Sequence, residues 1–190
     1  KAQNMAWTPG QALPKYTDLL HLDLSTVEPS VAGPKKPQDR LPLAELGNVF
    51  SNAAAEGERT PEVVNVTPMK ADDAGIFAPL PERELKDGDI VIAAITACTN
   101  TSNPGLLIAA GLLAKTANEL GMKVPDGVKT SLAPGSPVAT DFLTKAGLQE
   151  HLDALGFNTA GYGCTTCVGN SGPLAPSIED ALQNHDIIAA

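Results

Sequence analysis

Three cysteines are the residues of this sequence whose type and spacing are best suited to chemistry. Cys164 and Cys167 form a C-x-x-C pair, and Cys98 stands alone far upstream. Three thiolates are one fewer than an iron–sulfur cube or a closed zinc site normally takes. A cube held by three thiolates leaves one iron open to water or to a substrate oxygen, and such an iron can act as a Lewis acid. The cysteines therefore favour catalysis at a metal over electron transfer.

The cysteines lie in loops that follow predicted strands. The apolar run at residues 89–96 predicts a buried strand before Cys98, and residues 157–160 predict another before Cys164. Parallel sheets place ligand sites at the carboxyl ends of their strands, so the two cysteine loops can converge there. Small cysteines can also simply fill core space. These loops, however, are polar, glycine-rich and close to helix starts, where N–H groups stabilise thiolates, and this favours metal ligation.

Beyond residue 89 the sequence alternates between strand and helix patterns. Further strands are expected at 128–132 and 187–190, and helices at 104–120, 137–146, 149–155 and 177–183. Asn103 and Ser136 are suited to N-caps because each precedes a proline that can occupy the first helical position. Strands separated by helices predict an α/β fold, specifically three α/β/α layers around a mainly parallel sheet.

The first 80 residues are expected to be an irregular N-terminal extension and linker that packs on the unit formed by residues 81–190. Prolines exclude a long helix before residue 40, and they are Pro9, Pro14, Pro29, Pro34 and Pro37. Residues 17–24 could form a strand or a short buried segment, and helical spacing returns at 43–55. The extension and the unit together are expected to make one domain.

Composition limits the classes of function. A hydrophobic content of 43% and a charged content of 18% are those of an ordinary globular protein. No apolar run reaches the roughly 18 residues of a membrane span, so no membrane partner is expected. A net charge of −9 argues against a general nucleic-acid binder. Three cysteines cannot all pair as disulfides, which favours thiolate ligands in a reducing compartment and a cytoplasmic location.

Other polar residues give weaker signals. One of His21, His151 and His185 could complete a Cys₃His zinc site, but their positions are those of ordinary solvated or core histidines. Lys35, Lys36 and Arg40 form a basic cluster in a proline-bounded loop. Composition favours a solvated loop there, and docking between domains is the alternative.

Four stretches of the sequence together resemble the aconitase family, in the branch of aconitase A and the iron-regulatory proteins. They are LSTVEPSVAGPKKPQDR, TACTNTSNP, VKTSLAPGS and GFNTAGYGCTTCVGNSGPL. The resemblance runs from about Tyr16 to the end and is densest between residues 90 and 174. Isopropylmalate isomerases and homoaconitases share this cysteine layout, but their surrounding loops differ from GYGCTTCVGNSGPL.

The resemblance implies that Cys98, Cys164 and Cys167 are the ligands of a [4Fe–4S] cluster. In that family the fourth iron binds the hydroxyl and a carboxylate of citrate or isocitrate and promotes reversible dehydration through cis-aconitate. The implied activity is that of a hydro-lyase of the tricarboxylic acid cycle, acting on a tricarboxylate. A 2-methylisocitrate dehydratase is the alternative enzyme. RNA binding by the cluster-free form, or a zinc-binding module, is the alternative of another class.

The sequence departs from the family pattern in two respects, of which the first is mild and the second is more serious. Lys36 stands where relatives often have arginine. The family enzymes are also several times longer, and their arginine-bearing substrate motif is expected just after Ala190. The base serine and the histidine–carboxylate pairs lie in other domains. The chain therefore resembles the third, cluster-bearing domain, with no catalytic residue of its own, with other domains of the same polypeptide as partners, and predicted to be inactive alone.

Overall fold

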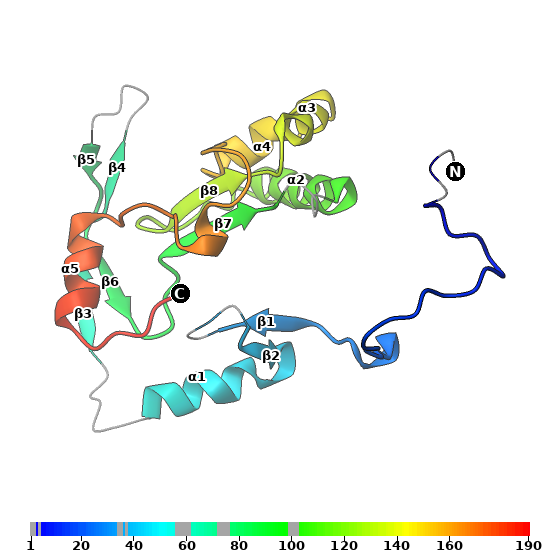
Figure 1. The fold of residues 1–190 in the computed structure, drawn as a ribbon. Helices are drawn as coiled ribbons and strands as arrows, with labels where there is room; N and C mark the ends of the chain where they lie inside the picture. Colours follow the sequence, from blue (N-terminus) through cyan, green and yellow to red (C-terminus); the bar gives the residue numbers. More distant parts are fainter. Residues whose placement is uncertain are drawn as a thin grey trace. The chain divides into compact units, whose positions relative to one another are not determined.

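The computed structural model describes residues 3, 5–33, 36, 38–55, 62–71, 77–98 and 103–190 (Figure 1). The chain divides into two compact units, residues 1–49 and residues 50–190. The expected division into residues 1–80 and 81–190 stays a prediction. Among the described residues, no helix combines the length and the apolar character that crossing a membrane requires.

The first unit contains little regular structure. Strand β1 (Ser30–Ala32) pairs antiparallel with β2 (Arg40–Pro42), with Val31 opposite Leu41. The short 3-10 helix η1 (Leu24–Thr26) begins at Asp23, whose carboxylate accepts a hydrogen bond from the Ser25 amide. The 3-10 helix η2 (Leu43–Glu45) leads directly into α1 (Leu46–Ala55), which crosses the division between the units. The helical spacing predicted at 43–55 is therefore confirmed.

The prediction of a strand or buried segment at residues 17–24 is wrong. All eight side chains are exposed, and only Leu24 enters a regular element, the first turn of η1. A strand needs a partner for its N–H and C=O groups. Among the described residues, no segment pairs with residues 17–24, so their apolar side chains have nothing to pack against.

The second unit begins with short antiparallel pairs that the sequence did not predict. Strand β3 (Val63–Val66) pairs with β6 (Arg83–Lys86), and β4 (Met69–Ala71) pairs with β5 (Phe77–Pro79). Helix α5 (Pro176–Asn184) packs against β3. These elements, together with the residue before β7, share a buried cluster of Val66, Leu85, Val91, Ile178 and Ala181.

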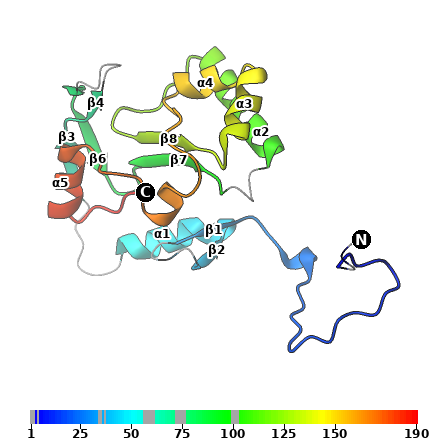
Figure 2. The same ribbon diagram turned by 45° about the horizontal axis from the view of Figure 1, so that its top comes forward.

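A parallel pair of strands carries the rest of the second unit. Strand β7 (Ile92–Thr96) pairs in parallel with β8 (Lys129–Ala133), with Thr96 opposite Ala133. The connection contains α2 (Pro104–Glu119), and α3 (Pro137–Lys145) and α4 (Gln149–Ala154) follow β8. Figure 2 shows the three helices grouped beside the pair. Their common core consists of Leu107, Ala114, Leu132, Ala139, Leu143, Leu148 and Leu152.

Hydrogen bonds extend this parallel arrangement at both edges. Thr159 forms a parallel bridge with Leu132 of β8. At the edge of β7, the Val91 amide donates to the Ala190 carbonyl over 2.6 Å, and the Ala190 amide donates to the Asp89 carbonyl over 3.0 Å. In place of the expected strands, residues 157–160 form a single β-bridge and residues 187–190 form a few main-chain hydrogen bonds. The fold is a mixture of helices and strands, as expected.

The helices agree closely with the sequence. Those expected at 104–120, 137–146, 149–155 and 177–183 lie at Pro104–Glu119, Pro137–Lys145, Gln149–Ala154 and Pro176–Asn184. Asn103 caps α2, its side chain accepting from the Gly105 amide over 2.9 Å. Ser136 is the N-cap residue of α3, as expected, although its side chain makes no capping hydrogen bond. Pro137 still supplies the pre-set backbone angle of a first helical residue.

Candidate metal centre

The three cysteine thiols lie together at the carboxyl ends of the parallel strands. Their sulfur atoms are all within 4.8 Å of one another, and the Cys98 and Cys164 sulfurs are 3.2 Å apart. Cys98 follows β7 by two residues, while Cys164 and Cys167 follow the Thr159 bridge. All three residues are exposed. The structure thus brings together two loops that are far apart in the sequence.

Three successive carbonyl groups at the end of β8 fasten both cysteine-bearing segments. The Ala97 amide, next to Cys98, donates to the Ala133 carbonyl over 3.0 Å. On the other side, the Ala160 and Gly163 amides donate to the Leu132 and Pro134 carbonyls, each over 2.8 Å. Leu132, Ala133 and Pro134 are fully buried, so their main chain cannot shift without disturbing the core. The positions of the thiols therefore follow from the packing of β8.

A short 3-10 helix, η3 (Thr166–Val168), shapes the C-x-x-C turn and carries Cys167. The Thr165 carbonyl accepts from the Val168 amide over 3.1 Å and from the Asn170 amide over 3.0 Å. Gly169 ends the turn with a φ of 83°. The turn is therefore closed by its own main chain, which directs Cys167 toward the other two thiols.

Hydroxyl groups add contacts around the turn. The Thr96 and Thr165 hydroxyl oxygens are 3.5 Å apart, which links β7 to the residue after Cys164. The Tyr162 hydroxyl lies 3.1 Å from the Thr140 hydroxyl, which itself donates to the Pro137 carbonyl, so Tyr162 is the donor. These contacts connect the cysteine loop to β7 and to the first turn of α3.

The electrostatics of the site favour a bound cation. The hydrogen bond with Cys98, and then the negative charges that Cys98 and Cys167 would carry, raise the pKa of Cys164 to about 11. Three thiolates at this separation repel one another unless a positive charge lies between them. A thiophilic metal or an iron–sulfur group supplies that charge, and an all-sulfur donor set is the set that such groups prefer. The residues present therefore fit an iron–sulfur group.

The histidines considered as further ligands lie elsewhere. Within the described ranges, the group of His, Cys, Asp and Glu side chains able to hold a metal contains the three cysteines alone. His185 Nδ1 contacts the Glu62 carboxylate, His151 lies within α4, and His21 is exposed in the first unit. Three thiols with no fourth donor among the described residues would leave one side of a bound group open.

Part of the basic cluster is engaged locally. Arg40 forms an ion pair with Glu28 over 3.2 Å and donates to the Ser30 hydroxyl over 3.1 Å. The Lys36 amide donates to the Asp39 carboxylate over 3.0 Å, and Lys35 lies outside the described residues. These contacts hold the loop in shape within its own unit. Docking of the loop on another domain stays a prediction.

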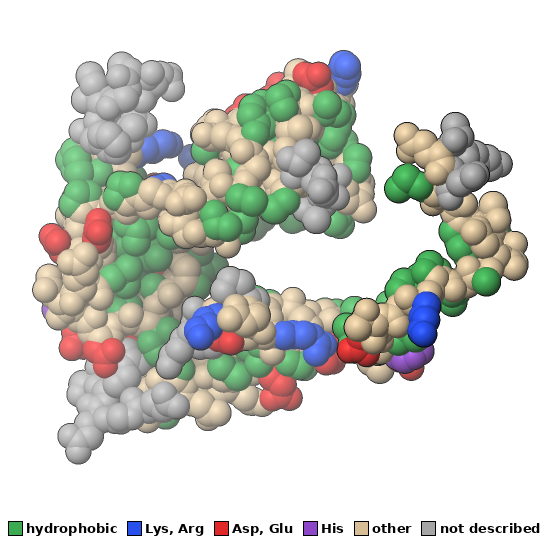
Figure 3. All heavy atoms as spheres, in the orientation of Figure 1, with side chains coloured by type: hydrophobic (Ala, Val, Ile, Leu, Met, Phe, Trp, Pro, Cys, Tyr) green, Lys and Arg blue, Asp and Glu red, His purple; other side chains and the backbone are tan. Residues whose placement is uncertain are grey.

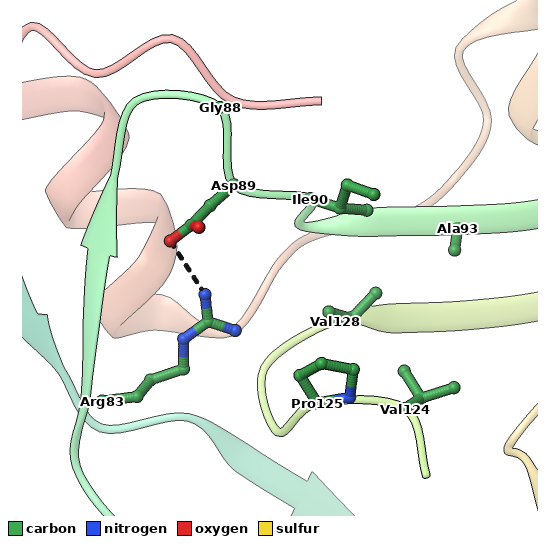
Figure 4. A pocket seen from close by; sticks show the side chains of 8 residues that line it. All are labelled: Arg83, Gly88, Asp89, Ile90, Ala93, Val124, Pro125 and Val128. Atoms are coloured by element: carbon green, nitrogen blue, oxygen red, sulfur yellow. Dashed lines mark hydrogen bonds and ion pairs between the residues drawn. The ribbon is translucent and has the colours of Figure 1, made fainter. Parts of the chain in front are cut away.

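A separate cavity of about 430 Å³ lies near the amino ends of β7 and β8 (Figure 4). Arg83 crosses it, pairing with the Asp89 carboxylate over 3.0 Å and donating to the Asp126 carbonyl over 2.7 Å. The Lys86 amide also donates to Asp89. The two charged side chains of the cavity are thus paired with each other, and its other side chains are apolar. Through these two contacts, Arg83 links the turn before β7 to the segment before β8.

The sequence did not reveal the residues that hold the loop in place. Thr96, Thr165 and Tyr162 could have been noticed only as hydroxyl side chains adjoining the cysteine motifs. The hydrogen bonds to the β8 carbonyls cannot be predicted from residue types, because every residue has a main-chain carbonyl group.

Comparison with known proteins agrees with the geometry. Residues 1–189 match the model of a family described as the aconitase family (aconitate hydratase). The chain is 50% identical over 190 residues to Aconitate hydratase A of Legionella pneumophila, covering 100% of this chain and 20% of that protein. The protein of the same name from Deinococcus radiodurans is 47% identical over 190 residues, with 100% and 21% covered. That of Staphylococcus aureus strain MW2 is 51% identical over 176 residues, with 92% and 20% covered. The chain thus spans about a fifth of the length of these relatives.

Proposed function

Because this chain belongs to the aconitase family, we propose that it is the cluster-binding part of an aconitate hydratase. Such an enzyme is a hydro-lyase of the tricarboxylic acid cycle that interconverts citrate and isocitrate through cis-aconitate. Family membership implies an iron–sulfur cofactor, and the proposal specifies a [4Fe–4S] cluster with Cys98, Cys164 and Cys167 as its ligands. The observation that carries the proposal is the convergence of these three thiols within 4.8 Å.

The residues of this chain would hold and orient the cluster. When bound, the cluster supplies a Lewis-acidic iron that no protein thiolate occupies. The three thiolates balance its charge, and the buried end of β8 fixes their positions through the Ala97, Ala160 and Gly163 amides. The exposure of all three cysteines leaves a route by which a tricarboxylate can approach.

The ligand set is tested by anaerobic reconstitution with iron and sulfide. We expect about four irons per chain, falling toward three on mild oxidation, because one iron has no protein ligand. Cys98→Ser, Cys164→Ser and Cys167→Ser should each abolish stable incorporation. Ser171→Ala, a change in the same loop that removes no sulfur, is the matched control and should load normally. Normal iron content in any cysteine variant would remove that residue from the set.

The same measurement separates the alternatives of another class. A zinc-binding module would contain zinc without sulfide, and elemental analysis of anaerobically purified protein distinguishes the two. A 2-methylisocitrate dehydratase would load the same cluster and differ only in substrate turnover. RNA binding by the cluster-free chain has less support, because the net charge is −9.

Catalysis requires residues beyond this chain. Iron supplies one part of the reaction, while proton transfer needs a positioned base and clamps on the substrate. We therefore propose that other domains of a longer polypeptide provide these groups, and that such a protein acts in the cytoplasm. A reconstituted chain of these 190 residues should not turn over citrate or isocitrate. Appreciable isomerisation by the chain alone would contradict this division of labour.

The proposal extends to the architecture. We infer three α/β/α layers around a mainly parallel sheet, with residues 1–80 as an extension that packs on residues 81–190. The parallel bridge at Thr159 and the bonds at Ala190 support further parallel strands on both sides of the β7–β8 pair. Hydrogen exchange in a full-length protein tests this, because residues 157–160 and 187–190 should then be protected as strongly as Ile92–Thr96.

A further inference from the structure

Helix α2 already has one buried face. Leu107, Gly111 and Ala114 are buried where α2 packs on α3 and α4. The approach to α4 is so close that a Cβ atom on Gly111 would lie 2.8 Å from the Leu148 Cβ. This face accounts for the position of the helix in its unit, and an ordinary surface helix would be polar on the opposite side.

A second apolar face of α2 is uncovered. Leu106 and Leu113 of α2 are 70% and 72% exposed, and Leu120, the C-cap residue of the helix, is 72% exposed. Residues seven apart on a helix point within about 20° of the same direction, so the three side chains form one stripe. The stripe is about 21 Å long at a rise of 1.5 Å per residue. We call these three residues the leucine stripe.

Charged residues are absent from the leucine stripe and its alanine neighbours. Lys115 and Glu119 are the charged residues of α2, and they pair with each other over 3.9 Å. By helical geometry they lie roughly 100–180° around the helix from the stripe residues. Ala109, Ala110 and Ala117 flank it instead. The helix therefore has two apolar faces and only a narrow charged sector.

We propose that the leucine stripe packs against an apolar helix that belongs to the same longer polypeptide but lies outside these 190 residues. This inference rests on the proposed function, because it requires that longer polypeptide. The relatives are about five times as long as this chain, so most of the surface available to cover the stripe lies elsewhere in them. With Ala110 and Ala117 between them, the three leucines give an apolar residue every 3.5 positions on average, which is the spacing that pairs with another helix lying along α2.

Hydroxyl-radical footprinting of the full-length protein tests the contact without any substitution. Leu112 is the internal control, since it is adjacent to Leu113 in the sequence, is 52% exposed and points about 100° away. We expect the stripe leucines to be oxidised several-fold more slowly than Leu112, in a protein that light scattering shows to be monomeric. Oxidation of the stripe at the rate of Leu112 would overturn the proposal. Protection that disappears on dilution of a dimer would overturn it too, in favour of a second copy.

A pair of variants measures the strength of the contact. In the full-length protein, Leu113→Gln should speed proteolytic cleavage within α2 about tenfold to a hundredfold, which is the equilibrium effect of exposing one buried leucine. Leu112→Gln makes the same chemical change outside the stripe and should leave cleavage nearly unchanged. If Leu113→Gln does not fold, Leu113→Ala should show a smaller increase in the same direction. Equal cleavage of the Leu113 and Leu112 variants would contradict the contact.

The two proposals fail in different ways. Absence of citrate and isocitrate isomerisation in the unsubstituted, cluster-loaded full-length protein would remove the proposed function. The footprint does not depend on turnover, so it would still report whether the stripe is covered. If the protein is active but the leucine stripe is oxidised as fast as Leu112, the proposed contact of the stripe is contradicted and the proposed function is not.

Discussion

The end of β8 and the stretch of residues 5–29 show how differently apolar residues can be used in one chain. Leu132 in β8 is 0% exposed, whereas Leu20 is 93% exposed. Both are leucines in segments without charge runs, so hydrophobicity alone does not separate them. The difference lies in partners: β8 is bonded on one side to β7 and on the other to Thr159, while every side chain of residues 5–29 is exposed.

The contrast also explains which part of the chain can hold reactive side chains in fixed positions. Around β8, buried side chains hold three carbonyls in place, and those carbonyls hold the cysteine loops. In the first unit, large apolar side chains are visible at the surface of the same stretch (Figure 3). They include Met5, Trp7, Leu13, Tyr16, Leu19, Leu22, Leu24 and Val27. Since no side chain of residues 5–29 is buried, none of them is held in place by packing.

The largest expected difference is between the effects of replacing Leu132 and Leu20 by alanine. Leu132→Ala should lower the free energy of unfolding by about 2–5 kcal/mol, because it leaves a cavity in the core. Leu20→Ala should change it by less than about 0.5 kcal/mol, as for most surface substitutions. Urea unfolding followed by circular dichroism measures both. Similar losses in the two variants would mean that residues 5–29 have a buried partner in solution.

The next effect compares two helical glycines. Gly111→Ala in α2 should destabilise the protein by about 1–3 kcal/mol, because the added methyl collides with Leu148 across the contact between helices. Gly47→Ala in α1, where a Cβ would meet nothing within 4 Å, should instead be neutral or stabilising by up to about 1 kcal/mol. Thermal melts give the sign of each change. Stabilisation by Gly111→Ala would show that α2 and α4 are farther apart than they are here.

A smaller effect is expected inside the cysteine loop. Gly163 has a φ of 86°, a left-handed conformation that costs other residues about 1–2 kcal/mol, although a Cβ there would meet no atom. Gly163→Ala should therefore lose about that much stability and release iron faster. Gly161, in the same loop, has no positive φ, and its added Cβ would make only an ordinary 4.0 Å contact with Thr165. Gly161→Ala is the control, and equal iron release from both variants would exclude backbone strain as the cause.

The smallest effect is expected at Asp23. Hydrogen bonds from the Ser25 hydroxyl and amide lower the pKa of this exposed carboxyl from its ordinary value of 3.8. The stabilising contribution of the ionised Asp23 carboxylate is therefore fully present above about pH 3.8, and it is lost as the pH falls through the lowered pKa. Asp23→Ala should nevertheless leave the global unfolding midpoint unchanged, because η1 has no buried residue. A shifted midpoint at pH 7 would show that η1 is part of a cooperative core.

The sequence predicts the helices of the second unit well because their signals are local. Pro104 and Pro137 mark helix starts, and apolar spacing defines the helix bodies. The meeting of the cysteine loops is likewise predictable, since it follows from the rule that ligands gather at the carboxyl ends of parallel strands.

The remaining features depend on partners that are distant in the sequence. Strands β3 to β6 have three or four residues each, and so short a strand forms only where its partner lies alongside. Residues 17–24 have the apolar content of a strand, but among the described residues no strand pairs with them. The fastening of the cysteine loops by β8 involves main-chain groups, which no residue pattern encodes.

The separation of Cys98 from Cys164 also sets an order of events during synthesis. The two residues are 66 positions apart. A ribosome adding 5–20 residues per second therefore takes roughly 3 to 13 s to make Cys164 after Cys98 has been incorporated. During that interval the first thiol has neither of its neighbours, and the β8 carbonyls that align it emerge only partway through. Any binding of one group by all three thiols must then follow synthesis of the loop that contains Cys167.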